Sequence, residues 1–111
     1  LCTGSGCVVV SVVSALVTPK RNNYEPPVAA MEVSALATDL VPAAIVLAAR
    51  NAARHGVDAR IEFRASDLFQ SIDAAQQGTF DLITTSIRPE AGKRGDVVRR
   101  AGLFIDSIIS I

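Results

Sequence analysis

Residues 37–57, ATDLVPAAIVLAARNAARHGV, form the stretch that decides the fold. A mostly apolar run at residues 31–38 overlaps the start of this stretch and ends at Asp39. Pro42 then suits the first turn of a helix, where its missing N–H costs nothing. The next residues are rich in alanine and carry two arginines one turn apart, near the end where cations favour the helix dipole. Gly56 is the expected stop residue. The stretch therefore predicts a strand that ends at Asp39, followed by a helix that runs to His55.

Outward from this stretch, the same strand and helix patterns recur in both directions. Strands are expected at residues 31–38, 60–65, 80–85 and 103–111, and short helices at residues 68–75 and 96–100. In residues 60–65, the side chains of Ile61, Phe63 and Ala65 are expected on one face. Residues 7–17 are rich in valine, and by propensity alone they favour a strand. Alternating strands and helices predict an α/β fold, a parallel sheet with helices on its faces.

Length and charge set limits on the kind of protein. The chain has 111 residues, which suits a single domain over residues 1–111, with a Pro- and Asn-rich loop insertion at about residues 18–30. Eleven basic and eleven acidic residues cancel, which argues against a broad nucleic-acid surface. The longest apolar run, residues 7–17, is too short to span a bilayer. Neither nucleic acid nor a membrane is therefore an expected partner.

Metal binding and nucleophilic catalysis find little support in the composition. The chain has two cysteines, Cys2 and Cys7, and one histidine, His55, which are too few for a zinc site of the usual spacing. His55 is expected at the end of a helix, on the surface. No Ser-His-Asp or Cys-His set can be assembled at the ligand-binding edge.

Three features are expected at the carboxyl ends of the strands, where open parallel sheets bind ligands. The first is the Gly-rich turn Thr3-Gly4-Ser5-Gly6, whose backbone can approach a ligand closely. The second is Asp39, a carboxylate that can accept hydrogen bonds from a ribose diol. The third is Asp67, or the backbone beside it, which can form a hydrogen bond with an adenine amino group. Each also has a plain structural interpretation, as a tight turn or as an acidic residue that stabilises the start of a helix.

Four stretches of the chain, taken together, resemble the release-factor glutamine methyltransferase family. They are LCTGSGC, ATDLVPAAIVLAARNAARHGV, RIEFRASDLF and FDLI, and the resemblance covers about residues 1–86. It implies a Rossmann-like class I methyltransferase sheet with helices on both faces, in which residues 7–17 form a helix. It also implies S-adenosyl-L-methionine as the cofactor and a glutamine of a peptide chain release factor as the substrate. An intracellular protein, cytoplasmic or mitochondrial, would follow.

The resemblance assigns cofactor-binding roles by position. The turn formed by Cys2, Thr3, Gly4, Ser5 and Gly6 would wrap the methionine end of the cofactor. Asp39 would hold the ribose, and Asp67 with Leu68 would border the adenine. The implied chemistry is direct methyl transfer, in which the protein mainly positions the reactants.

The chain also departs from the family's pattern. An Asn-Pro-Pro-Tyr motif follows the FDLI-type strand in the family and orients the acceptor amide. Here Ser86 stands at the position of the Asn, followed by Ile87, Arg88 and Pro89. We also expect the sheet to be truncated before its first strand and shortened at its C-terminal end.

Three hypotheses therefore stay open. The first is a protein-(glutamine-N5) methyltransferase, and the second is a non-catalytic cofactor-binding or remnant domain that acts as an interaction module. The third is half of a dinucleotide site. It is the weakest, because Val9 stands where the third fingerprint glycine is needed.

Overall fold

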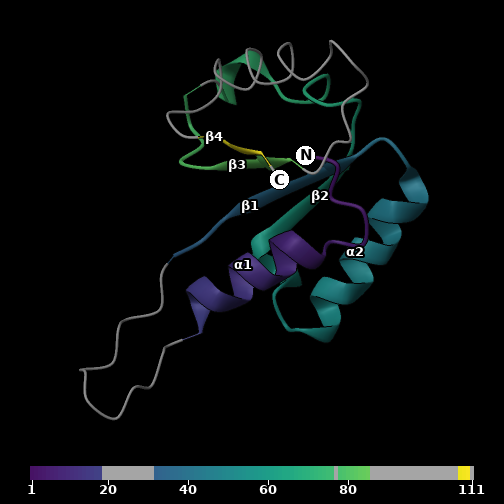
Figure 1. Cartoon of the computed structure of the whole chain (residues 1–111), viewed down its shortest axis with the longest axis vertical. Helices are drawn as coiled ribbons and strands as arrows, with labels where there is room; N and C mark the ends of the chain where they lie inside the picture. The colour runs from purple at the N-terminus through teal and green to yellow at the C-terminus, as the bar shows by residue number, and fades with distance from the viewer. Residues whose placement is uncertain (19–31, 77, 86–107, 111) are drawn as a thin grey trace.

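The computed structural model describes residues 1–18, 32–76, 78–85 and 108–110 (Figure 1). In chain order the elements are α1 (Cys7–Val17), β1 (Ala35–Asp39), α2 (Pro42–Arg54), β2 (Ile61–Ala65), β3 (Ile83–Thr85) and β4 (Ile108–Ser110). Two single turns of 3₁₀ helix, η1 (Asp58–Arg60) and η2 (Ala74–Gln76), flank β2 in the chain. The described residues thus form a small α/β structure.

The unit β1–α2–β2 is the best-defined part of the fold. Strands β1 and β2 pair in parallel, in a register that runs from Ala35 opposite Ile61 to Asp39 opposite Ala65. Parallel neighbours need a crossover, and α2 supplies it. Helix α2 begins at Pro42, and Gly56 follows its end with a φ of 68°, so the helix prediction is confirmed.

The main hydrophobic core lies between this unit and α1. Its buried side chains are Val10, Val13, Ala37, Ala52, Val57 and Ile61. Ala48 and Ala52 of α2 have no exposed surface, and small side chains at these positions let neighbouring backbones approach closely. The alanines that favour a helix therefore also determine how tightly α2 packs.

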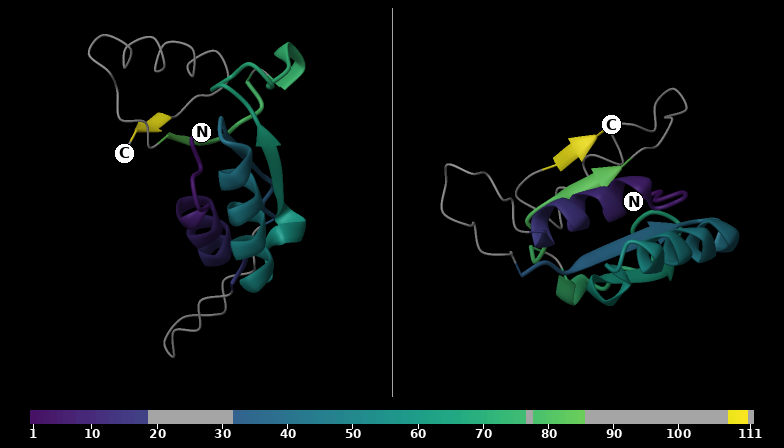
Figure 2. Two further views of the ribbon diagram at one scale, coloured as in Figure 1. Left: turned by 90° about the vertical axis from the view of Figure 1, so that its right-hand side faces the viewer. Right: turned by 90° about the horizontal axis from the view of Figure 1, so that it is seen from below.

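Residues 7–17 form a helix, as the family resemblance implies and against their valine-rich composition. Val10 and Val13 lie three residues apart on the buried face of α1, and both belong to the core. The burial of this face outweighs the strand propensity of valine, because tertiary packing commonly overrides local preference. The two helices lie side by side (Figure 2). Helices on both faces of a sheet stay a prediction.

The described strands form two separate sheets of two strands each, β1–β2 and β3–β4, both parallel. The first three residues of the chain lie between them. The N–H of Thr3 donates to the carbonyl of Thr38 in β1 at 2.9 Å, and the amino group of Leu1 donates to the carbonyl of Thr84 in β3 at 2.8 Å. Figure 1 accordingly places the N-terminus between β1 and β3.

The helix expected at residues 68–75 is wrong. Leu68 has a φ of 50°, which breaks a right-handed helix at its start, and only Ala74–Gln76 form a single 3₁₀ turn. The hydroxyl of Ser66 explains the difference, because it donates to the carbonyl of Leu68 and accepts the N–H of Ser71. Such side-chain bonds to the backbone compete with helix formation.

Other expectations are met in part or lie outside the described residues. Strand β1 begins at Ala35 rather than at residue 31, and β3 at Ile83 rather than at residue 80. Strand β4 falls within the expected strand at residues 103–111. The expected helix at residues 96–100, most of the loop at residues 18–30, and Ser86 all lie outside the described residues. Among the described residues, no helix has the length and apolar character needed to cross a bilayer.

Candidate functional site

The glycine-rich turn and Asp39 are joined directly. The N–H of Gly4 donates to Oδ2 of Asp39 at 2.9 Å, and the N–H of Val41 donates to Oδ1 at 2.9 Å. The side chain of Asp39 thus ties the turn to the start of α2. A carboxylate has about four acceptor positions, and these two bonds leave room for further donors such as ribose hydroxyls.

A second set of contacts holds the turn against α2. The carbonyl of Ser5 accepts a hydrogen bond from Nδ2 of Asn51 at 2.9 Å, and the N–H of Gly6 donates to the carbonyl of Thr3 at 2.8 Å. Gly6 has a φ of 78°, and a Cβ built on it would lie 2.9 Å from Cβ of Ala48. A glycine is therefore required at position 6 for both backbone conformation and space.

Gly4 differs from Gly6 in its surroundings. Its φ is 55°, and a Cβ built there would meet nothing within 4 Å. The backbone of the turn is therefore open at this point, beside the carboxylate of Asp39. An open backbone next to a carboxylate is an arrangement that suits a ligand carrying hydroxyl groups.

Asp67 reaches the same edge through β2. The N–H of Ser66 donates to the carbonyl of Asp39 at 2.9 Å, so the chain leaves β2 next to the end of β1, and the exposed Asp67 follows. Cys2 is close to both carboxylates: burial raises the pKa of its thiol, and the charges of Asp39 and Asp67 raise it further. The structure thus brings together the glycine-rich turn, Asp39 and Asp67, as the strand topology predicts. Their role in binding a cofactor stays a prediction.

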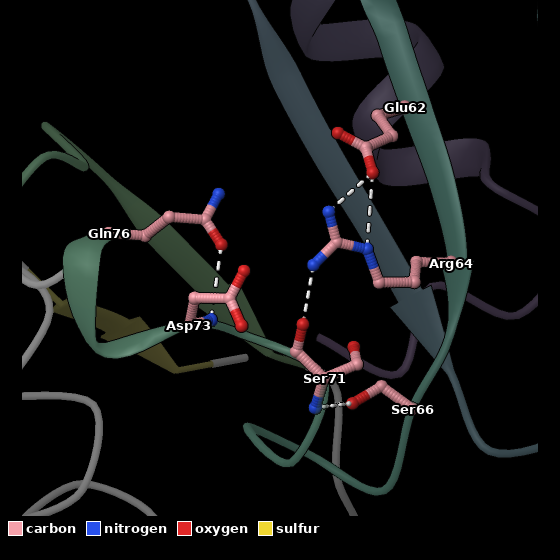
Figure 3. Close-up of polar contacts among 6 residues, drawn as sticks. All are labelled: Glu62, Arg64, Ser66, Ser71, Asp73 and Gln76. Carbon is pink, nitrogen blue, oxygen red and sulfur yellow. Dashed lines mark hydrogen bonds and ion pairs between the residues drawn. The ribbon is translucent and has the colours of Figure 1, made fainter.

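The loop that carries Asp67 is held by a polar network that sequence reasoning missed (Figure 3). The half-buried guanidinium of Arg64 donates to the carboxylate of Glu62 and to the carbonyl of Ser71. The hydroxyl of Ser66 accepts the N–H of Ser71 at 3.1 Å. Arg64 and Ser66 therefore hold this loop from two sides.

The alternation expected in β2 holds only in its first part. Ile61 is buried, but Ala65 is exposed and Arg64 is half-buried, because the loop folds back over the guanidinium. The signal for this arrangement is the charge pair Glu62 and Arg64, which share one face of a strand two residues apart.

Leu68 is the expected site residue that the structure places least favourably. Its side chain packs against the small cluster of Phe69 and Ile83, so it is directed toward β3. A hollow does lie beside Asp67, and it is lined by Leu40, Ala65, Ser66, Asp67, Gln70 and Ser71. Leu40 and Gln70 thus border this hollow and Leu68 does not, and an adenine contact at Asp67 and Leu68 stays a prediction.

The single histidine of the chain lies beyond the end of α2 that is farther from this edge. His55 follows the end of α2 and is exposed, as expected. Among the described residues, no group of three or more potential ligands could hold a metal ion.

Comparison with known proteins gives one partial similarity. The release factor glutamine methyltransferase of Cereibacter sphaeroides is 40% identical to this chain over 70 residues. Those residues are 63% of this chain and 20% of that protein, so the matched stretch spans a fifth of the length of its relative. No family model and no solved structure matches the chain. The similarity supports the family weakly, and the structure is compatible with part of a methyltransferase fold.

Proposed function

We propose that this chain carries the cofactor-binding edge of an S-adenosyl-L-methionine-dependent methyltransferase. The observation that supports this most is the bond from Gly4 N–H to Asp39 Oδ2 at 2.9 Å, which joins the glycine-rich turn to the acidic residue at the end of the neighbouring strand. The partial similarity to a glutamine methyltransferase points to the same class of cofactor.

The residues at the edge fit the parts of this cofactor. The open backbone at Gly4 lies next to the remaining acceptor positions of Asp39, which suit the two ribose hydroxyls. The turn from Cys2 to Gly6 would hold the methionine end, and the hollow beside Asp67 would take the adenine. The cofactor supplies an electrophilic methyl group, and the residues of this chain bind and orient it.

For the acceptor, we propose a glutamine side chain of a peptide chain release factor. This proposal rests on the name of the partial relative and on the sequence resemblance. It concerns the whole protein to which such an edge belongs, because the match spans a fifth of the relative.

A second candidate is a domain that binds the cofactor but transfers no methyl group. Ser86-Ile87-Arg88-Pro89 stand where the family has Asn-Pro-Pro-Tyr, and this favours the second candidate for the chain itself. A single hydroxyl at Ser86 cannot accept both amide hydrogens of a glutamine in the way that an Asn side chain and a proline carbonyl do.

Calorimetric titration with S-adenosylhomocysteine tests the cofactor proposal. We expect the chain to bind it, and we expect Asp39→Ala to weaken binding by about 1–3 kcal/mol, the cost of leaving buried hydroxyls unpaired. Asp39→Asn keeps one acceptor oxygen and is the variant for use if the alanine variant unfolds. Asp58→Ala is the matched control, because Asp58 lies in η1 at the opposite end of β2 and is exposed.

The outcomes separate the two candidates from a structural remnant. No binding by a folded chain would refute the cofactor role. If neither Asp39→Ala nor Asp58→Ala changes the affinity for S-adenosylhomocysteine, Asp39 is not part of the site. Where binding is found, incubation with labelled S-adenosyl-L-methionine and a release factor distinguishes a transferase from a binding domain.

A further inference from the structure

Helix α2 carries a continuous row of exposed residues on the side opposite its buried alanines. Ala48 and Ala52 are fully buried, and the helix packs on β1, β2 and α1. The exposed residues recur every three or four positions, which places them on one face of the helix. Beyond Pro42 they are Ala43, Val46, Leu47, Arg50, Ala53 and Arg54, termed the outer face of α2 from here on.

The first half of the outer face is apolar. The side chains of Val46 and Leu47 are exposed at 61% and 43% of their surface, and Ala43 lies one turn before them. Of the helical residues that the structure describes, Val46 is the most exposed large hydrophobic. Neighbouring apolar side chains that both face water on a helix are typical of a surface that another molecule covers.

The second half of the outer face is basic. Arg50 and Arg54 are exposed and lie one turn apart, and α2 contains no acidic residue. Among the described residues, neither guanidinium has an ion-pair partner, in contrast to Arg64, which pairs with Glu62. Two such cations next to apolar side chains favour a partner that presents carboxylates and apolar groups on one surface, because complementary charges determine which partners associate.

Three other occupants fit this face less well. A second copy of the chain, packed outer face to outer face, would bring the arginines of both copies together with no acidic residue of α2 to pair them. Nucleic acid does not match the apolar half, because interfaces with nucleic acid are polar and strongly positive. A membrane favours helices that are apolar along their whole length, whereas this face is apolar only in its first half.

The helix dipole gives the direction of a helical partner. The C-terminal end of α2, near Arg54, carries partial negative charge, and the N-terminal end of a partner helix carries partial positive charge and favours acidic residues. Antiparallel packing therefore places the acidic first turns of the partner beside Arg50 and Arg54, and its next turns beside Val46 and Leu47.

We propose that the outer face of α2 is a docking surface for an amphipathic helix of another protein. This helix lies antiparallel to α2, and it carries two carboxylates one turn apart, followed by apolar residues on the same face. The carboxylates pair with Arg50 and Arg54, and the apolar residues cover Val46 and Leu47. The proposal does not depend on the cofactor role.

The test uses two synthetic peptides of about 18 residues, each an alanine-based helix with leucines on one face of its second half. The first peptide has two glutamates one turn apart on the same face of its first half, and the second has lysines in their place. Fluorescence anisotropy measures the affinity of each labelled peptide for the full chain, and amide chemical shifts locate the contact. We expect the glutamate peptide to bind more tightly, with the largest shifts in residues 43–54.

Variants of the chain assign the two halves of the surface. Leu47→Ser should weaken binding of the glutamate peptide by about tenfold. Leu82→Ser should not change it, and it is the matched control because Leu82 is exposed to the same degree, at 44%. Arg50→Glu should weaken binding of the glutamate peptide by about tenfold and strengthen binding of the lysine peptide, whereas the exposed Arg60 of η1, changed to Glu, should do neither.

Each outcome decides the proposal. No binding of the glutamate peptide up to about 1 mM would overturn it, and so would equal affinity for the two peptides. A dimer of the chain that Leu47→Ser dissociates, detected by sedimentation, would also overturn it, because a second copy would then cover the outer face. Binding to vesicles of an anionic phospholipid that Leu47→Ser abolishes would overturn it in favour of a lipid surface.

Discussion

Gly6 of the glycine-rich turn lies directly against Ala48 of helix α2. A Cβ added to Gly6 would lie 2.9 Å from Cβ of Ala48 and 3.1 Å from its Cα. The fully buried Ala48 thus leaves no room for a side chain at position 6. The pair holds the turn beside Asp39, so the shape of the candidate site depends on a contact between two of the smallest residues.

Gly6→Ala should lower the free energy of unfolding by about 2–4 kcal/mol. The left-handed φ of 78° contributes about 1–2 kcal/mol, and the contact with Ala48 contributes the rest. Gly4→Ala is the matched control, because Gly4 has a φ of 55° but open space around it, and it should cost about 1–2 kcal/mol. Urea denaturation measures the free energy of unfolding of the unchanged chain and of the two variants.

The contact itself is isolated by a double-mutant cycle. In the double variant Gly6→Ala with Ala48→Gly, the added methyl group no longer meets a side chain at position 48. The double variant should therefore be more stable than the sum of the two single changes predicts, by a coupling energy of about 1–2 kcal/mol. The single variant Ala48→Gly accounts for the usual cost of glycine in a helix. A coupling near zero would show that backbone strain alone explains the loss at position 6.

The fold near β1 could be predicted because its signals are local. Asp39, Pro42 and Gly56 each act within a few residues of themselves, so the end of a strand and both ends of a helix can be inferred from sequence. The position of Asp39 and Asp67 at the same edge of the sheet could also be predicted, because parallel strands place their carboxyl ends at one edge.

The features that could not be predicted depend on distant or side-chain contacts. The valines of α1 become helical through burial of Val10 and Val13, which local propensity does not reveal. The left-handed Leu68 follows from a hydroxyl two residues earlier that binds its carbonyl. The separation of the strands into two sheets concerns residues as far apart as Leu1 and Thr84, which no periodic pattern connects.

Ser66→Ala should destabilise the loop that carries Asp67, whereas Ser71→Ala should not. The hydroxyl of Ser66 makes two hydrogen bonds to backbone groups, and its loss should lower the free energy of unfolding by about 1–2 kcal/mol. Ser71 contributes its N–H and carbonyl, while its own buried hydroxyl has no partner among the described residues. Thermal denaturation compares the two variants, and equal losses would contradict the assigned role of Ser66.

Thr38→Val should raise the free energy of unfolding by about 1 kcal/mol. The side chain of Thr38 is 1% exposed, and its hydroxyl has no hydrogen-bond partner among the described residues, so the folded state bears an uncompensated desolvation cost. Thr38→Ser keeps the hydroxyl but removes a buried methyl group, and should lower stability by about 1 kcal/mol. A loss in Thr38→Val, measured by urea denaturation, would show that the hydroxyl is bonded.

The pH dependence of stability should show a maximum between about pH 8 and pH 9, from two groups at the amino end of the chain. Burial lowers the pKa of the Leu1 ammonium below its usual 8.0. At a pH between the lowered pKa of the folded state and the pKa of 8.0 in the unfolded state, the unfolded state binds more protons than the folded state. Stability therefore rises with pH up to about 8. Burial raises the pKa of Cys2 above its usual 9.0, so above that pH the unfolded state binds fewer protons and stability falls.

Urea denaturation from about pH 6.5 to pH 10 measures both limbs of this curve, and variants assign them. Cys2→Ala should remove the fall above pH 9, whereas Cys7→Ala should keep it, because Cys7 is exposed at the start of α1. Placing residues before Leu1 turns the ammonium into a peptide N–H and should remove the rise below pH 8. If the alkaline fall persists unchanged in Cys2→Ala, the thiol is not its source, and the burial of Cys2 beside Asp39 and Asp67 has no energetic consequence.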